Sequence, residues 1–273
     1  KDGYKGNYLI EIAKIIRKEH GDKLQESDPI FLQKTENNIF NIIKSTLGKI
    51  GVQHDYFSNE KTFYDNGSID ELMSSLKNKK LIYEAGGATW FKTTALGKKQ
   101  DRVLIKSTGE PTYRLPDMAY HQDKMKRGFD LIIDVFGADH VDTYPDVLAC
   151  LKALDFDTDK IKILIHQFVT LIKGGKIVKM STREGQFITL EHLINEVGSD
   201  VVRYFFIMRG MNSHLNFDMD MAKDQSDQNP VYYLQYAHAR ISNIIKNGKS
   251  FGYELSESFY PELLSHNSEI DLL

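Results

Sequence analysis

The sequence predicts an α/β protein with a parallel sheet, a β-rich insertion before that sheet and an α-helical segment after it. Two mostly apolar runs of strand length, residues 131–136 and 161–165, flank a helical pattern at residues 146–154. Asp134 alone interrupts the first run. Such runs are typical of strands buried on both faces, and the strand–helix–strand order favours parallel pairing. We therefore expect these two strands to be neighbours in one sheet.

Helical spacing of apolar residues predicts three helices before the insertion. The first carries apolar residues from 9 to 16 on one face and ends near Gly21, and the second covers residues 32–49. The third opens at residues 68–71 (SIDE), which have the form of a capping box. In a capping box, the Ser and Glu side chains satisfy free amide groups of the first turn.

The insertion and the last segment have different patterns. Short stretches of strand-forming residues at 81–83, 89–91 and 102–105 are separated by turns that contain Gly or Lys. After Gly198 the spacing becomes fully helical, and a long helix is expected at residues 230–246, with a stop at Asn247-Gly248.

Composition excludes several classes of protein. The chain has 273 residues, 41% of them hydrophobic and 27% charged, so it can form a substantial core and is not expected to be disordered. The sequence contains no run of 18 apolar residues, so it predicts no membrane-spanning helix. The one cysteine, Cys150, lies in an apolar stretch, which favours a core residue and fits a reducing, cytoplasmic setting. We expect no metal site, since a single thiol cannot form a multi-cysteine one.

One basic segment could bind a polyanion, although the net charge of −3 gives no sign of nucleic-acid binding. Residues 173–183 hold four cations and no acid, with glycines in and beside the segment. Cations on such a loop suit a polyphosphate, because they offset charge that develops during reaction. A solvated basic surface loop is the alternative.

A polar turn follows the first predicted sheet strand. Residues 137–140 (GADH) stand at the carboxyl end of that strand, where open α/β sheets bind ligands. Gly137 would let the backbone approach a ligand, and Asp139 could accept hydrogen bonds from ribose hydroxyls. The alternative is a strand-to-helix turn with an Asp cap.

Glu60, Tyr113 and Asp117 form a third candidate group. Tyr113 and Asp117 are four residues apart, so at the start of a helix they would share one face. Two carboxylates that converge on one pocket suit a planar guanidinium, which forms paired, charged hydrogen bonds with carboxylates. For each acid alone, a solvated surface position is the alternative.

Together these motifs resemble those of arginyl-tRNA synthetases, a family of class I aminoacyl-tRNA synthetases. Residues 179–183 (KMSTR) resemble the KMSKS loop of the class, and residues 137–140 resemble its Gly-x-Asp turn at the ATP ribose. Longer stretches match the arginyl family in its order: 2–6 (DGYKG), 55–60 (DYFSNE), 101–106 (DRVLIK), 112–121 (TYRLPDMAYH), 130–140 (DLIIDVFGADH) and 199–220 (SDVVRYFFIMRGMNSHLNFDMD). The resemblance covers residues 1–248.

The resemblance implies two sets of binding residues. Four would bind arginine, through its guanidinium or near its amino-acid part: Glu60, Tyr113, Asp117 and His140. Five would bind ATP: Gly137, Asp139, Lys179, Met180 and Ser181. Within the KMSTR loop, Lys179 and Ser181 would be the catalytic residues. Thr182 and Arg183 replace the usual Lys and Ser, so the loop lacks a second lysine, for which arginyl enzymes often use a lysine elsewhere.

The resemblance also refines the expected fold. The chain would hold a partial Rossmann-like nucleotide-binding domain: residues 1–228 would be the second half of a class I catalytic domain, with the insertion at about 52–110. Residues 229–273 would begin a helical anticodon-binding domain. The sequence has no HIGH-type motif. Members of the family carry this motif upstream of the position that corresponds to Lys1. We therefore expect this chain alone to be inactive.

The implied activity is arginine–tRNA ligation in protein synthesis, with L-arginine, ATP with Mg²⁺ and tRNA(Arg) as substrates, in a cytoplasmic monomer. A non-catalytic arginine- or tRNA-binding module is one alternative, and a HIGH-type motif upstream would argue against it. Another class I synthetase is a second alternative. The paired acids disfavour it, because an apolar or thiol substrate has no use for them.

Overall fold

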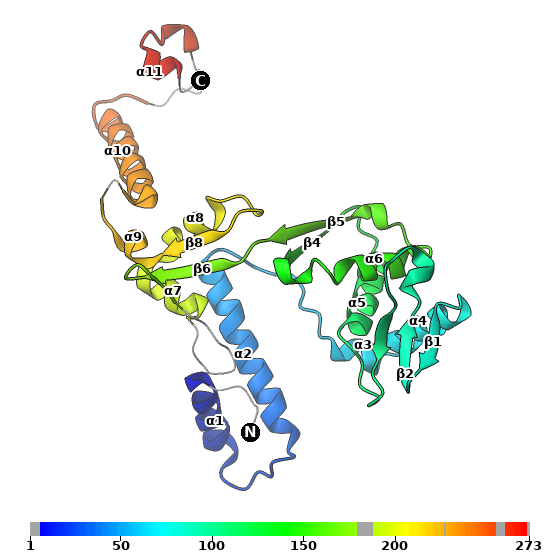
Figure 1. Cartoon of the computed structure of the whole chain (residues 1–273). Helices are drawn as coiled ribbons and strands as arrows, with labels where there is room; N and C mark the ends of the chain where they lie inside the picture. Colours follow the sequence, from blue (N-terminus) through cyan, green and yellow to red (C-terminus); the bar gives the residue numbers. More distant parts are fainter. Residues whose placement is uncertain (1–5, 179–187, 227, 255–259, 272–273) are drawn as a thin grey trace.

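The computed structural model describes residues 6–178, 188–226, 228–254 and 260–271. A helical hairpin comes first, two α/β regions follow it, and a helical arm ends the chain (Figure 1). None of the described helices is both long enough and apolar enough to cross a lipid bilayer.

The first α/β region comprises residues 61–166. Its helices are α3 (Lys61–Asp65), α4 (Ser68–Asn78), α5 (Arg114–Lys126) and α6 (Tyr144–Ala153). Its strands are β1 (Ile82–Ala85), β2 (Ala88–Phe91), β3 (Arg102–Ile105), β4 (Ile132–Gly137) and β5 (Ile161–His166). Its 3-10 turns are η1 (Thr93–Leu96), η2 (Ala138–His140) and η3 (Thr158–Lys160).

The predicted parallel strands are neighbours, so this expectation is confirmed. β4 and β5 pair in parallel, in a register that runs from Ile132 opposite Ile161 to Gly137 opposite His166. The β-rich insertion is also confirmed, because β1, β2 and β3 form an antiparallel sheet in that order. The helix predicted to open at residues 68–71 is present as α4, and the short helix α3 precedes it.

A single apolar core joins the insertion to the parallel strands. Leu72, Phe91 and Met118 are fully buried in it, and so is Cys150, as its apolar surroundings predict. The buried carboxylate of Asp146 links α6 to α5, because its Oδ2 accepts a hydrogen bond of 3.1 Å from Nε of Arg114. Nε of Arg102 on β3 lies 3.0 Å from the same oxygen, without hydrogen-bond geometry. A buried acid needs such cations, and here they hold β3, α5 and α6 together.

The second α/β region comprises residues 169–223 and has its own core. Its elements are β6 (Val169–Lys173), β7 (Lys176–Ile177), α7 (Leu190–Val197), α8 (Ser199–Ile207), β8 (Leu215–Asp218) and α9 (Met219–Lys223). The expectation of a fully helical pattern after Gly198 is wrong at β8, which pairs in parallel with β6. Leu215 and Phe217 of β8 are buried, whereas Asn216 between them is exposed, so this short strand covers one face of the core.

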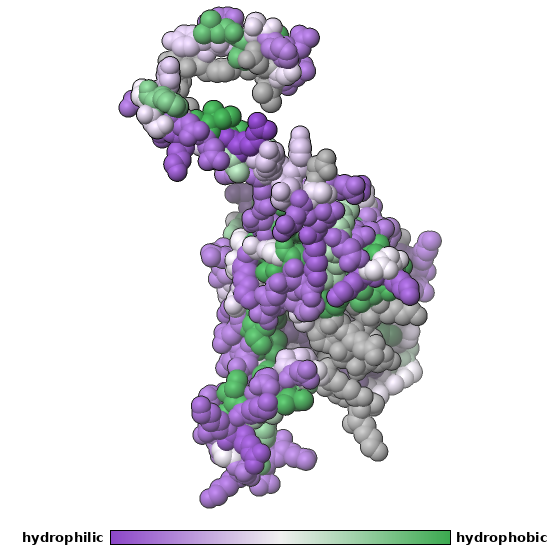
Figure 2. All heavy atoms as spheres, turned by 90° about the vertical axis from the view of Figure 1, so that its left-hand side faces the viewer, coloured by the Kyte–Doolittle hydropathy of each residue, from purple (hydrophilic) through white to green (hydrophobic). Residues whose placement is uncertain are grey.

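The helical hairpin precedes the two α/β regions in the chain, and the helical arm follows them. The hairpin is α1 (Asn7–His20) and α2 (Pro29–Lys49), and the arm holds α10 (Pro230–Ser250), η4 (Pro261–Leu263) and α11 (Asn267–Ile270). α2 keeps apolar side chains on its surface, among them Leu32 and Ile42. Figure 2 shows apolar patches toward the end of the molecule that holds the hairpin, and others along the arm.

Two expected helix boundaries are wrong in detail. Ser68 is the first residue of α4 rather than its N-cap, and its amide donates a hydrogen bond of 3.0 Å to Asn66 Oδ1. Gly67 supplies the turn there with φ of 79°. At the other end of the chain, α10 continues through Asn247 and Gly248 to Ser250.

Candidate functional site

Four of the predicted residues line one cavity of about 500 Å³, which we call the α3–α5 cavity: Glu60, Tyr113, Asp117 and His140. The sequence analysis missed most of its remaining wall, which is largely aromatic and includes His54, Tyr56, Phe57, Phe63, Tyr120 and Phe136. Residues far apart in the chain therefore meet here.

Local structure explains how each side chain reaches the cavity. Glu60 precedes the first turn of α3, and Tyr113 precedes α5. The Asp117 amide donates a hydrogen bond of 3.2 Å to the Tyr113 carbonyl, so these two residues stand one helical turn apart on one face. His140 ends the 3-10 turn that follows β4. Its ring stacks on that of Phe136, with centroids 5.2 Å apart.

The two acids that line the cavity form no ion pair with a Lys or Arg of the described chain. The Glu60 carboxylate has no hydrogen bond or ion pair with another residue of the described chain, and no Lys or Arg from that part of the chain lines the cavity. Burial, and after it the charge of Glu60, raises the pKa of the Tyr64 hydroxyl. Two acids among aromatic rings suit a cation, because carboxylates bind it directly and ring faces attract it.

Asp117 also belongs to an ionic cluster that extends into the core and that the sequence analysis did not predict. Its other members are His121, Lys124 and Asp134. His121 Nε2 lies 3.0 Å from Oδ2 of Asp134, and Lys124 Nζ lies 2.5 Å from Oδ1 of the same carboxylate. Asp134 was visible in the sequence as the polar break in a buried strand. A charge at such a position requires a partner, and that was the available signal.

Hydrogen bonds set the charge state of this cluster. Burial by itself lowers the pKa of His121, but hydrogen bonds to the carboxylates of Asp117 and Asp134 outweigh it and raise that pKa to about 9. For Asp134, burial raises the pKa, and the bonds from His121 and Lys124 more than offset this, so the pKa is lowered. At neutral pH the cluster therefore holds an imidazolium between two carboxylates.

The GADH turn lies at the carboxyl end of the β4–β5 pair. Asp139 is exposed, and its Oδ1 folds back over Gly137, where an added Cβ would lie only 2.5 Å from it. Glycine thus leaves room for this carboxylate to cover the turn. Gly137 and Asp139 do not line the α3–α5 cavity, but they adjoin it through Phe136 and His140.

Lys179, Met180 and Ser181 lie outside the described residues. The described chain leads to them through the β6–β7 hairpin, whose turn uses positive φ at Gly174 and Gly175. The Gly174 amide donates a hydrogen bond of 2.6 Å to Oδ2 of Asp220 on α9, which anchors the hairpin.

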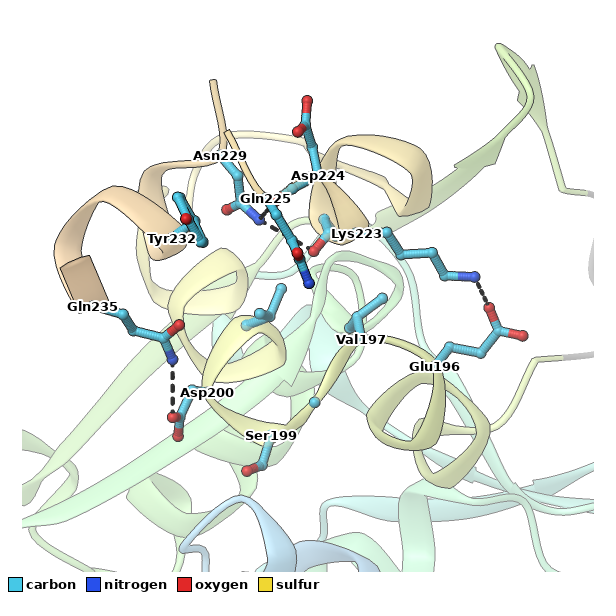
Figure 3. A pocket seen from close by; sticks show the side chains of 13 residues that line it. Glu196, Val197, Ser199, Asp200, Lys223, Asp224, Gln225, Asn229, Tyr232 and Gln235 are labelled. Atoms are coloured by element: carbon cyan, nitrogen blue, oxygen red, sulfur yellow. Dashed lines mark hydrogen bonds and ion pairs between the residues drawn. The ribbon is translucent and has the colours of Figure 1, made fainter. Parts of the chain in front are cut away.

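A second cavity of about 420 Å³, the α7–α10 cavity, lies between α7, α8, α9 and the start of α10 (Figure 3). None of the predicted residues lines it. Its polar groups pair with one another: Lys223 forms an ion pair with Glu196, and Gln235 donates a hydrogen bond of 3.2 Å to Asp200. Asn229 in its wall is buried and fully bonded. The Gln235–Asp200 bond and the bonds of Asn229 attach the arm to the second α/β region.

Comparisons with known proteins give a consistent result. A sequence model described as tRNA synthetases class I (R), catalytic domain, matches residues 11–244. An arginine–tRNA ligase of Salinibacter ruber is 47% identical over 275 residues, covering 100% of this chain and 49% of that protein. Another from Desulfotalea psychrophila is 51% identical over 247 residues, covering 90% and 45%. The chain thus spans about half the length of the curated relatives it matches.

Solved structures agree with the observed architecture. A Campylobacter jejuni structure described as an arginyl-tRNA synthetase superposes with a TM-score of 0.80 at 33% identity, covering 92% of this chain and 55% of that one. Thermus thermophilus arginyl-tRNA synthetase gives a TM-score of 0.62 at 15% identity, covering 93% and 53%, which is a likeness of fold alone.

Proposed function

The chain belongs to the class I arginyl-tRNA synthetase family, and on that premise we propose that it provides the arginine pocket of an arginine–tRNA ligase. One observation carries the proposal: the acids Glu60 and Asp117 and the ring of Tyr113 line the same α3–α5 cavity, where no described cation pairs with Glu60 and His121 contacts only one oxygen of Asp117. The guanidinium of arginine would supply the missing positive charge.

The proposed reaction has two steps. The carboxylate of arginine attacks the α-phosphate of ATP, the bond to the β-phosphate breaks, and arginyl-adenylate and pyrophosphate form. A terminal hydroxyl of tRNA(Arg) then attacks the activated carbonyl, and AMP leaves. Neither step needs a covalent protein nucleophile, so catalysis consists of positioning and charge stabilisation.

Each candidate residue has a part in this scheme. Glu60 and the free oxygen of Asp117 would bind the guanidinium, Tyr113 would close the wall, and His140 would lie near the reacting end of arginine. Gly137 and Asp139 would contact the ATP ribose next to that end. The position of the GADH turn beside the cavity supports this order.

The basic loop belongs to the same proposal. Lys179 and Ser181 would be catalytic, and together with Met180 they would bind adenine and the phosphates as ATP is consumed. Magnesium would accompany ATP as part of the substrate. Lys179 is expected to stabilise charge on the phosphates during the reaction, so it should matter more for turnover than for arginine binding.

We further propose the domain limits that the sequence predicts. Residues 1–228 would belong to the catalytic domain and residues 229–273 would begin the anticodon-binding domain. Asn229 supports this boundary, since its Oδ1 caps α10 through the Val231 amide at 3.0 Å. A cytoplasmic monomer completes the proposal.

The test is arginine-dependent ATP–pyrophosphate exchange with tRNA, measured on the protein at its full natural length. Citrulline is the sharpest probe of the pocket, because it has the shape of arginine but carries a neutral ureido group. Arginine should support exchange and citrulline should not, since a pocket of paired acids rejects a ligand that leaves them uncompensated. Lysine should be rejected as well, because its ammonium lacks the planar fork.

Glu60→Gln should weaken arginine in this assay, whereas Asp200→Asn, in the other cavity, should not. Equal use of citrulline and arginine, or an unchanged response to arginine in Glu60→Gln, would contradict the proposal.

A further inference from the structure

One carboxylate in the α3–α5 cavity is held in place, and the other is not. The Glu60 carboxylate has no hydrogen bond or ion pair with any other described residue, whereas Asp117 Oδ1 lies 3.2 Å from Nδ1 of His121. The same ring nitrogen lies 2.8 Å from the Asp117 carbonyl oxygen, one helical turn back. His121 therefore contacts both the backbone and the side chain of Asp117.

His121 is itself fixed from its other side. Its Nε2 lies 3.0 Å from Oδ2 of Asp134 on β4, and its side chain is 3% exposed. The rings of Tyr120 and Phe136 lie beside it, with centroids 6.0 and 6.3 Å away. The imidazole thus has little freedom to rotate, and any group bonded to it shares that restriction.

The charges around His121 balance. The charged groups that face it are Asp117 and Lys124 from α5 and Asp134 from β4. With His121 as an imidazolium, two positive groups meet two carboxylates. A neutral imidazole could donate to only one of the two acids, and the other would face a lone pair. Lys124 Nζ, 3.2 Å from Nε2, opposes the second proton, but the contacts with Asp117 and Asp134 outweigh it and favour the doubly protonated ring.

We propose that His121 is a positioning residue for arginine recognition: held by Asp134, it fixes one carboxylate oxygen of Asp117 and leaves the other directed to the guanidinium. This inference rests on the proposed function of the α3–α5 cavity. A carboxylate held in one rotamer before the ligand arrives loses less conformational freedom on binding than a free one. This chain of contacts runs from Asp134 on β4 through His121 on α5 to Asp117 at the cavity.

Two substitutions separate the two contacts of the ring. In His121→Asn, the amide nitrogen can take the place of Nδ1 and still donate to Asp117. In His121→Gln, the longer side chain places its nitrogen near the position of Nε2, so the bond to Asp134 can survive while that to Asp117 is lost. Both variants remove the ring and its charge, so both should lower thermal stability.

The measurement is arginine affinity by calorimetry on the protein at its full natural length, with the KM for ATP as a second readout. His121→Gln should weaken arginine about tenfold, which matches the lower end of a charged hydrogen bond. His121→Asn should weaken it about threefold or less, and neither should change the KM for ATP. His192→Gln is the matched control, because that exposed histidine also faces an acid one turn away, with His192 Nε2 3.5 Å from Glu196.

The pH dependence adds a test that does not require the Gln variant to fold. The ratio of arginine affinities, native over His121→Asn, should decline as the pH rises through about 9, where the native imidazolium loses its proton. Titration of the amino group of arginine is common to both proteins and cancels in the ratio. A ratio that stays constant between pH 7 and pH 10 would overturn the inference.

The remaining outcomes separate the inference from its premise. Equal losses in the Asn and Gln variants would indicate a structural role only and would overturn it, as would an unchanged affinity in the Gln variant. If Asp117→Asn weakens arginine while His121→Gln does not, this inference alone fails. If Asp117→Asn has no effect either, the proposed function of the cavity fails with it.

Discussion

The two cavities have similar volumes, about 500 and 420 Å³, and both are lined by acids, but these acids differ in their contacts. In the α3–α5 cavity, the Glu60 carboxylate has no hydrogen-bond or ion-pair partner among the described residues, and one oxygen of Asp117 contacts the buried His121. In the α7–α10 cavity, Glu196 is neutralised by Lys223, and Asp200 accepts a hydrogen bond from Gln235. No Lys or Arg of the described chain lines the first cavity, whereas Lys223 lines the second.

This difference supports the proposal that the first cavity binds a ligand and that the second joins structural elements. Glu60 is exposed to solvent, so its carboxylate is free to bind a ligand cation without breaking a contact within the described chain. An acid paired within the protein contributes to packing instead. The number of polar residues around a cavity says little until their partners are known.

The largest expected effect concerns the separate cores of the two α/β regions. Phe217 is fully buried in the second core and packs on Phe205, with ring centroids 5.1 Å apart. Phe217→Ala should lower the free energy of unfolding by about 3–5 kcal/mol. Hydrogen exchange should show lost protection in residues 169–223 and retained protection in residues 61–166. Equal loss in both regions would make them one cooperative unit and weaken the comparison.

The next effect is a pH dependence of the free energy of unfolding, which arises from His121 beside the α3–α5 cavity. The pKa of His121 is raised from 6.5 to about 9, so its contribution to stability is complete below about pH 6.5 and is lost as the pH rises through 9. The loss should reach at most about 3 kcal/mol. Urea denaturation at pH 6 and pH 10 would measure it.

The histidine of the other region provides the reference for that experiment. His121→Asn should flatten the pH profile, whereas His192→Gln should leave it as in the native protein. A native profile that does not fall between pH 6 and pH 10, relative to His121→Asn, would show that the buried cluster does not hold a proton as its geometry implies.

Third comes a pair of identical changes, one in each cavity. Asp117→Asn keeps the size of the side chain but removes its charge. A charged hydrogen bond contributes about 1.5–3 kcal/mol, so arginine affinity measured by calorimetry should fall by roughly ten- to a hundredfold. Asp200→Asn should leave arginine affinity unchanged. If both variants bind arginine as the native protein does, the acids of the α3–α5 cavity are ordinary surface groups.

Much of the fold could be predicted because its signals are local. The β4 and β5 strands are continuous apolar runs, and the spacing of Tyr113 and Asp117 fixes one face of α5 whatever surrounds it. β8 could not be found in this way. It has four residues, and only its pairing with β6, distant in sequence, makes it a strand.

The site divides along the same line. Each acid could be named from its motif, but the route by which Glu60 reaches Asp117 depends on how α3 packs on α5. The His121–Asp134 contact is likewise tertiary, since it joins a helix to a strand. The sequence shows a charged residue, Asp134, inside an apolar run, but it does not identify the residue that pairs with it.

The smallest expected effect tests the structural role assigned to the α7–α10 cavity. Asn229 Oδ1 caps α10 at the Val231 amide, and its Nδ2 donates to the carbonyls of Ala222 and Asp224, at 3.2 and 2.7 Å. Asn229→Ala removes the cap and leaves those groups without their partner, so the free energy of unfolding should fall by about 1 kcal/mol, and by no more than about 2. Asn247→Ala is the matched control, because that exposed residue lies within the same helix and should change stability by less than about 0.5 kcal/mol. Arginine affinity should stay unchanged in both variants, since the cap is remote from the α3–α5 cavity. A loss of arginine affinity in Asn229→Ala would mean that the junction with α10 communicates with the arginine pocket, and the division between a binding cavity and a structural one would no longer hold.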